Sequence, residues 1–125
     1  MRKTVLDVGN CSPDHSAIKT MLTSLYDVEV LQADQWTDTQ RILASQDVDL
    51  ILINRKLDID YSDGMEILKS LKSGKTSRHI PVMLVTNYPE HQQVAVEAGG
   101  VYGFGKLELN SPQTRERLGQ YLTPR

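Results

Sequence analysis

The stretches DLILIN (49–54) and IPVMLVT (80–86), with GMEILKSL (64–71) between them, decide the fold. The two outer stretches are aliphatic runs of strand length, and such near-continuous runs are typical of strands covered on both faces of a parallel sheet. The middle stretch has apolar residues at helical spacing. A strand, a helix and a second strand in this order require a crossover, which predicts two parallel strands.

The same alternation continues along the rest of the chain. Further strands are predicted at 4–8, 27–32 and 100–105, and further helices at 12–25, 35–45, 89–98 and 110–122. Ser12 and Ser111 are predicted N-caps, because each precedes a proline that suits the first helical turn. Five strand and helix pairs predict an α/β fold with a doubly wound parallel sheet, in which the second strand, with alternating polar and apolar residues, lies at an edge.

Length and composition limit the class of protein. The 125 residues suit one domain, 1–125, and 39% hydrophobic with 24% charged residues is ordinary for a globular protein. No apolar run is long enough to span a membrane, and the N-terminus lacks a signal-peptide core, so we expect a cytoplasmic protein. The net charge of −2, without a basic cluster, disfavours nucleic-acid binding. The single cysteine, Cys11, cannot form an internal disulfide.

Polar residues follow four of the predicted strands. They are Asn10, which Gly9 precedes, and Asn54, Thr86 and Lys106. The carboxyl ends of parallel strands lie at one edge of the sheet, where doubly wound folds bind ligands. The sequence therefore predicts that these residues meet at one site.

At these strand ends the sequence resembles the receiver domain of two-component response regulators. The motifs that carry the resemblance are IPVMLVT ending on Thr86, VEAGGVYGFGK ending on Lys106, and the DG pair at 63–64. The likeness covers nearly the whole chain. It implies a flavodoxin-like three-layer sandwich with strand order 2-1-3-4-5. It also implies that an acidic pair after the first strand binds Mg²⁺, that an aspartate after the third strand is phosphorylated, and that the Thr and Lys contact the phosphoryl group.

This sequence keeps Thr86 and Lys106 but has Gly9 and Asn10 at the acidic pair and Asn54 at the phosphoacceptor. An amide is a poor nucleophile, and a site without carboxylates should bind Mg²⁺ weakly, so no resident cofactor is expected. The chain therefore resembles a pseudo-receiver. We expect it to be no enzyme and to act in intracellular phosphorelay-type signalling through protein contacts.

Several contacts at the site follow as hypotheses. Asn54 is expected to hydrogen-bond Thr86 or Lys106, and Lys106 to pair with Asp58 or Asp60. An alternative role for these two loop acids is a rebuilt cation site, which would leave some phosphorylation-dependent or cation-dependent switching.

Neighbouring residues add three further hypotheses. Asp63 is predicted to be the N-cap of the third helix. Asp7, two residues before Gly9, would need a partner if buried. His15, His79 and His91 lie on separate elements and are given surface or capping roles.

A small flavodoxin-like enzyme is a further alternative. Cys11 lies between a strand and a helix, which is a setting that lowers a thiol pKa, but Ala17 stands where tyrosine phosphatases of similar fold have an arginine. The stretch GVYGFGKL (100–107) matches a phosphate loop only formally, because Leu107 replaces the required Ser or Thr.

A partner surface is predicted near the fifth strand. Tyr102 and Phe104 alternate with glycines there, next to the family's usual output face of fourth helix, fifth strand and fifth helix. They could anchor a protein partner or a second copy in a homodimer, although at least one is expected to pack in the core.

Overall fold

The computed structural model describes residues 2–125 and contains one five-stranded parallel sheet in the order β2-β1-β3-β4-β5. The strands are β1 (Lys3–Val8), β2 (Val28–Ala33), β3 (Leu50–Asn54), β4 (Val82–Val85) and β5 (Val101–Phe104). The predicted fold class and strand order are therefore confirmed, and β2 lies at an edge as expected.

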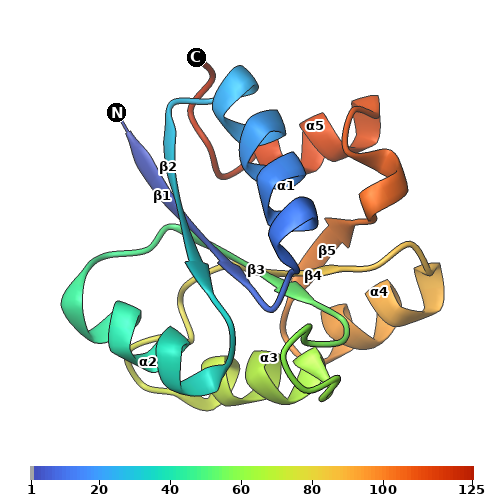
Figure 1. The fold of residues 1–125 in the computed structure, drawn as a ribbon. Coiled ribbons are helices and arrows are strands. Elements are labelled where there is room, and N and C mark those ends of the chain that lie inside the picture. Colours follow the sequence, from blue (N-terminus) through green and yellow to red (C-terminus); the bar gives the residue numbers. More distant parts are fainter. Residues whose placement is uncertain (1) are drawn as a thin grey trace.

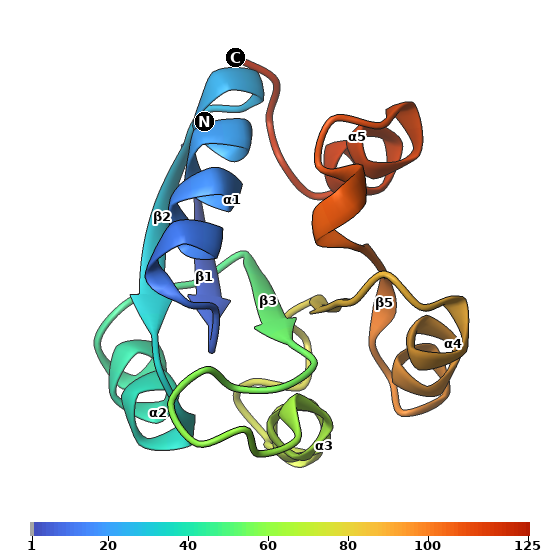
Figure 2. The ribbon, with the colours of Figure 1, turned by 45° about the vertical axis from the view of Figure 1, so that its right-hand side comes forward.

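Five α-helices cover both faces of this sheet. They are α1 (Ser12–Leu25), α2 (Trp36–Ser45), α3 (Gly64–Ser73), α4 (Pro89–Glu97) and α5 (Pro112–Gly119). Helices α1 and α5 lie on one face, and α2, α3 and α4 lie on the other (Figures 1 and 2). The result is the three-layer sandwich that the alternating strands and helices predict.

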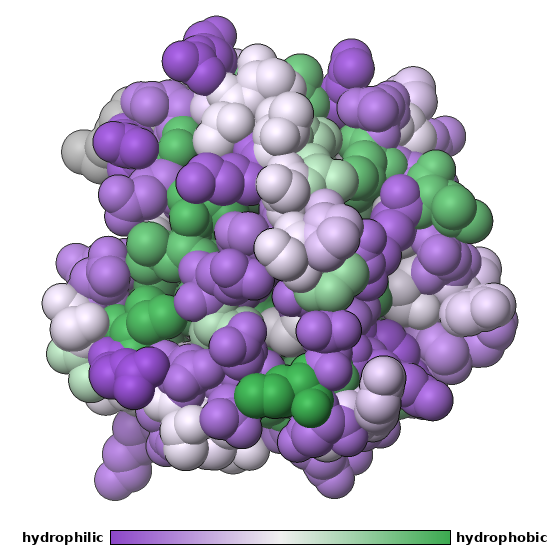
Figure 3. Space-filling view, in the orientation of Figure 1, coloured by the Kyte–Doolittle hydropathy of each residue, from purple (hydrophilic) through white to green (hydrophobic). Residues whose placement is uncertain are grey.

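The core consists of two hydrophobic clusters, one on each face of the sheet. In β3, Leu50 and Leu52 belong to the cluster with α1 and α5, whereas Ile51 and Ile53 belong to the cluster with α3 and α4. Successive side chains of a strand point to opposite faces, so a central strand must be apolar at every position. The outer surface in Figure 3 is predominantly hydrophilic, with hydrophobic side chains interspersed. None of the helices within residues 2–125 is both long and apolar enough to cross a membrane.

Two of the three predicted helix caps are confirmed. The Asp63 carboxylate accepts from the N–H of Met65, and the Ser111 hydroxyl accepts from that of Thr114. The prediction for Ser12 is wrong by one residue, because the N-cap of α1 is Cys11, whose side chain makes no cap bond. Pro13 still lies in the first turn, where its fixed φ suits the helix and its missing N–H costs no hydrogen bond.

The last strand is short and is followed by a 3-10 turn, η1 (Lys106–Glu108), which the sequence did not predict. A bulge shifts the register of β5 against β4 between Met83 and Val85. A Cβ at Gly103 would overlap the carbonyl of Leu84, so only glycine fits there. The missing side chain at Gly103 lets β5 lie close to β4 at the bulge.

Candidate functional site

The structure brings the predicted site residues to the carboxyl ends of the strands. We call the set Gly9, Asn10, Asn54, Thr86 and Lys106 the mouth. Parallel pairing aligns Val8 with Ile53 and Asn54 with Val85, so the residues that follow these strands meet at one edge. Asn54, Thr86 and Lys106 line a common hollow of about 450 Å³.

The amide of Asn54 is bound as a donor. Its Nδ2 lies 2.7 Å from the carbonyl oxygen of Lys56 and 3.5 Å from that of Gly9. Carbonyl oxygens only accept, so the nitrogen of the amide must face them. The predicted contact with Thr86 or Lys106 is wrong, because the loop after β3 turns its own carbonyl back toward the strand end.

Gly9 has no room for a side chain. Its φ of 81° lies in the left-handed region, and a Cβ there would overlap the side chain of Leu57. Leu57 is 3% exposed, and the N–H of Asp58 donates to the carbonyl of Gly9 at 2.8 Å. The loop after β3 therefore lies over the end of β1, where the resemblance places an acidic side chain. Sequence reasoning missed Leu57, because no local pattern distinguishes it from Ile59, which lies in the same loop and is exposed.

Asn10 faces the interior and contacts a buried carboxylate. Its Nδ2 donates to Asp7 Oδ1 at 2.5 Å, and His15 Nδ1 lies 2.7 Å from Asp7 Oδ2. Asp7 is fully buried, which raises the pKa of its carboxyl, and the bonds from His15 and Asn10 oppose that rise in part. The prediction that Asp7 needs a partner is confirmed. The assignment of His15 to a surface or capping role is wrong, because its ring serves this carboxylate.

Lys106 forms an ion pair with an acid from a different element than predicted. Its Nζ lies 2.7 Å from Asp14 Oδ2, on the first turn of α1, so the expected pairing with Asp58 or Asp60 is wrong. The hydrogen bond from Lys106 lowers the pKa of the Asp14 carboxyl. The 3-10 turn that starts at Lys106 directs its side chain toward α1, and no local sequence pattern indicated that turn.

Thr86 is engaged by the helix that follows it. Its Oγ1 lies 3.2 Å from His91 Nδ1 and accepts from the N–H of Tyr88 at 3.3 Å. The hydroxyl therefore helps to satisfy the first turn of α4, which has no side-chain bond from its own N-cap. The role given to His91, surface or capping, fits this contact near a helix N-terminus.

Neither Asp58 nor Asp60 pairs with Lys106 or lines the hollow of the mouth, although the backbone N–H of Asp58 bonds Gly9. Asp58 and Asp60 are exposed, Asp60 accepts from the N–H of Ser62, and Asp63 caps α3. The hydrogen bonds from Ser62 lower the pKa of the Asp60 carboxyl. Within residues 2–125, no group of three or more His, Cys, Asp or Glu side chains is arranged to hold a metal ion.

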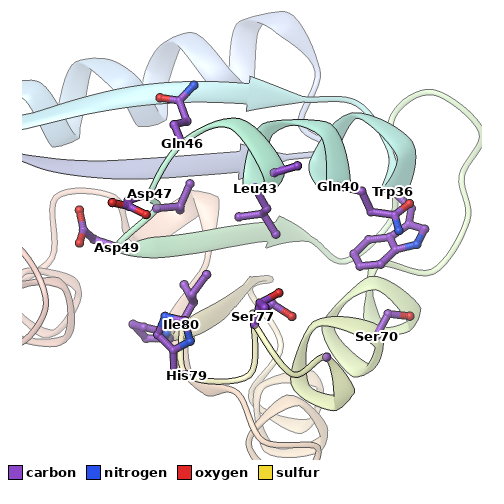
Figure 4. Close-up of a pocket in the computed structure, with 15 residues that line it drawn as sticks. Trp36, Gln40, Leu43, Gln46, Asp47, Asp49, Ser70, Ser77, His79 and Ile80 are labelled. Atoms are coloured by element: carbon purple, nitrogen blue, oxygen red, sulfur yellow. The ribbon is translucent and has the colours of Figure 1, made fainter.

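A larger hollow, of about 810 Å³, lies between α2 and the segment from α3 to β4 (Figure 4). Trp36 and Leu43 line it on the α2 side, and Ser77 and Ile80 face them from below. Asp49 accepts from the backbone N–H of Thr4, and the Ser77 hydroxyl donates to a backbone carbonyl. These polar groups hold the backbone in place, and none of the predicted site residues lies in this hollow.

The two predicted aromatic anchors on β5 have different environments. Phe104 is 1% exposed and belongs to the core, as expected for at least one of the pair, so it cannot contact a partner. Tyr102 is 38% exposed, and the guanidinium of Arg117 lies 4.2 Å from the centre of its ring. Only Tyr102 remains as a surface anchor.

Comparison with known proteins gives matches among solved structures alone. No family model and no curated protein matches the sequence. The signal receiver domain of a DNA-binding response regulator from Colwellia psychrerythraea 34H is similar with a TM-score of 0.77 and 18% identity, covering 94% of this chain and 96% of that one. Chemotaxis response regulator CheY4 of Vibrio cholerae has a TM-score of 0.72 and 17% identity over 92% of this chain and 98% of its own.

A third similar structure is the Mn²⁺-bound form of response regulator Rcp1. Its TM-score is 0.68 and its identity 19%, over 91% of this chain and 87% of its own. Identities this low show a shared fold and nothing finer. The chain has a flavodoxin-like α/β fold. More narrowly, its solved neighbours are receiver domains of response regulators, so the fold is the receiver-domain fold.

Proposed function

We propose that this chain is a pseudo-receiver that acts in two-component signalling through protein contacts, without aspartyl phosphorylation. In this proposal the protein acts in the cytoplasm. It binds neither nucleic acid nor a membrane directly, and it is not an enzyme. The whole of residues 1–125 serves as one signalling domain.

The observation that carries the proposal is the orientation of Asn54. A phosphoacceptor must present an anionic oxygen to phosphorus, whereas residue 54 presents an N–H donor to two carbonyl oxygens. The loop carbonyls are therefore placed for an amide. A carboxylate in the same position would face two acceptors without a proton to share.

The surroundings of Asn54 support the same conclusion for the metal. Mg²⁺ is held by carboxylates, and phosphoryl transfer needs it to neutralise developing charge. Gly9 is covered by Leu57, and Asn10 is turned toward Asp7. Neither position offers a charged oxygen to the mouth, so these residues do not fit the magnesium site that the receiver fold implies.

The surface of α4, β5 and α5 is the proposed contact with a protein partner or a second copy. Tyr102 on β5 and Val94 and Val96 on α4 are exposed there. Gln92 holds the two elements together, because its buried side chain donates to the carbonyl of Thr86 and accepts from the N–H of Gly103. A surface held in this way is presented in one fixed arrangement.

Beryllofluoride, which mimics a phosphoryl group on an aspartate, tests the proposal. The backbone NMR spectrum is recorded with Mg²⁺ and beryllofluoride, and with Mg²⁺ alone. We expect no saturable shifts at the amides of 54, 86 and 106 in either case. Saturable shifts at these amides would overturn the pseudo-receiver assignment, and shifts with Mg²⁺ alone would favour cation-dependent switching.

A further inference from the structure

The hollow at the mouth is lined by cations. The cations are Arg55, Lys56 and Lys106, and Thr86, Tyr88 and His91 also line the hollow. We call this hollow the basic hollow. No aspartate or glutamate of the described chain lines it. Its volume of about 450 Å³ is sufficient for several side chains of a partner.

Hydrogen bonds hold the backbone at Arg55 and Lys56, which are the two cations of the hollow outside the predicted site. The carbonyl of Arg55 accepts from the N–H of Gly64 at 2.8 Å, and the carbonyl of Lys56 accepts from Asn54 at 2.7 Å. Lys56 also forms an isolated β-bridge with Asp63. A binding group on a fixed backbone loses less freedom when it binds, which favours affinity.

Neither Arg55 nor Lys56 forms an ion pair with any residue in the range 2–125. The ion pairs there are His15 with Asp7, Arg41 with Asp38, and Lys106 with Asp14. The acids of the neighbouring loop do not neutralise the two cations. Asp60 and Asp63 line a separate hollow of about 280 Å³ over α3. Arg55 and Lys56 of this loop therefore line one hollow, and Asp60 and Asp63 line another.

The third cation shows which ligand the basic hollow accepts. Lys106 already binds a carboxylate, that of Asp14, with side chains that are 30% and 39% exposed. Exposed ion pairs contribute little to stability, so an incoming carboxylate can replace Asp14. The ligand class indicated by this contact is a carboxylate.

Exposed apolar side chains border the basic hollow. Tyr88 is 58% exposed and lines it, and Leu107, next to Lys106, is 86% exposed. The N–H of Leu107 is held by the side chain of Asn87, which also lines the hollow. A ligand that uses both features has carboxylates and apolar side chains close together.

We propose that the basic hollow is a docking site for an acidic segment of a partner protein, in which carboxylate and aliphatic side chains alternate. The inference rests on the proposed function, because phosphorylation or bound Mg²⁺ would change the charge at the mouth. It adds a second contact surface to that of α4, β5 and α5, and it names the chemistry of the partner. Carboxylates of the partner would then pair with the cations of the basic hollow.

NMR titration with a model segment tests the proposal. The probe is a capped hexapeptide of alternating Glu and Leu, and the matched control is the same peptide with Gln in place of Glu. We expect saturable shifts at the amides of 55, 56, 88 and 107 with the Glu peptide alone, weakening as salt is added. Inorganic phosphate is titrated separately, to distinguish a protein segment from a small oxyanion.

Variants of the protein test the assignment of the cations. Arg55→Glu with Lys56→Glu should abolish the shifts, whereas Lys75→Glu, at an exposed lysine beyond the end of α3, should leave them unchanged. Asp14→Asn should act in the opposite direction. It frees Lys106, so the affinity for the Glu peptide should rise by about two- to fivefold.

The inference is overturned if the Glu peptide gives no saturable shifts, if the Gln peptide binds equally well, or if the charge-reversed variant still binds. Saturation by phosphate without binding of the Glu peptide would also overturn it, in favour of a small-anion site. The titrations contain no phosphoryl donor. Failure of the proposed function is recorded separately, as uptake of a phosphoryl group from acetyl phosphate in the absence of peptide.

Discussion

Asn54 differs from an aspartate by one atom, yet the two residues need opposite surroundings. The amide nitrogen satisfies two carbonyls, those of Lys56 and Gly9, which a carboxylate would repel. The replacement is therefore built into the loop as well as into the side chain. For this reason we do not expect an aspartate alone to restore receiver chemistry.

The change Asn54→Asp should lower the free energy of unfolding by about 1–2 kcal/mol, because a bonded donor is replaced by an acceptor facing acceptors. Urea denaturation at neutral pH measures this difference. Asn110→Asp is the matched control at an exposed position just before α5, where a negative charge near a helix N-terminus is tolerated. Equal stability of wild type and Asn54→Asp would contradict the proposed role of the amide.

Asp7 and Asp14 should give stability profiles of opposite slope. The pKa of Asp7 is raised by burial, so its ionisation opposes folding, and Asp7→Asn should gain stability relative to wild type as the pH rises from about 4 toward 7. The pKa of Asp14 is lowered by Lys106, so its stabilisation is present above the unfolded pKa and is lost on acidification. Asp14→Asn should therefore lose stability relative to wild type as the pH rises toward the unfolded pKa of about 4, with little further change above that pH.

Urea denaturation at several pH values compares the two variants with wild type. If Asp7→Asn became less stable than wild type as the pH rose, the carboxylate of Asp7 would be held charged by His15 against the effect of burial. That result would contradict a raised pKa for the Asp7 carboxyl.

The sequence predicted which residues lie together at the mouth. It did not predict which residues they contact. Strand ends are fixed by strand pairing, so Gly9, Asn54 and Lys106 had to lie near one another. The partner of Lys106 depends on a 3-10 turn and on the first turn of α1. The contact of Leu57 with Gly9 depends on the path of a nine-residue loop that has no periodic pattern.

At the scale of elements, α4 is held to the sheet by one buried side chain. Gln92 is 2% exposed, donates to the carbonyls of Leu84 and Thr86, and accepts from the N–H of Gly103 at the bulge of β5. The bulge leaves a backbone donor that the ladder cannot pair, and the helix supplies the acceptor. Helix α4 and strand β5 are thereby linked.

Gln92→Ala should lower the free energy of unfolding by about 1–3 kcal/mol, because it leaves the buried N–H of Gly103 without an acceptor. Hydrogen exchange at the amide of Gly103 should accelerate more than exchange at the amides of β1. The neighbouring Gln93→Ala, at an exposed position of the same helix, is the control and should change neither measurement. Unchanged exchange at Gly103 in Gln92→Ala would show that this link is not needed.

The elements themselves followed closely from the sequence. The apolar runs predicted β3 and β4, because a strand buried on both faces must be apolar throughout. The caps Asp63 and Ser111 predicted the starts of α3 and α5. The errors occurred where tertiary contacts override local signals. The cap of α1 lies at Cys11 instead of Ser12, and η1 forms where no element was predicted.

At the scale of the whole molecule, the chain has the receiver-domain fold, and cations line its mouth where the resemblance implies carboxylates. The resemblance implies three carboxylates beside one lysine, whereas in this chain the hollow is lined by Arg55, Lys56 and Lys106 and by no acid of the described residues. Of the nearby acids, Asp7 is buried, Asp14 is paired with Lys106, Asp60 and Asp63 line the hollow over α3, and Asp58 is exposed. The sheet order positions the same strand ends, and the side chains there now suit a carboxylate ligand better than a metal ion.

The most direct test of the central claim is mass spectrometry of the intact protein after incubation with Mg²⁺ and acetyl phosphate. We predict an unchanged mass for the wild type and also for Asn54→Asp, because Gly9 and Asn10 still supply no charge for the metal. A gain of one phosphoryl group by Asn54→Asp would contradict the loss of the metal site. The same gain by the wild type would contradict the pseudo-receiver assignment itself.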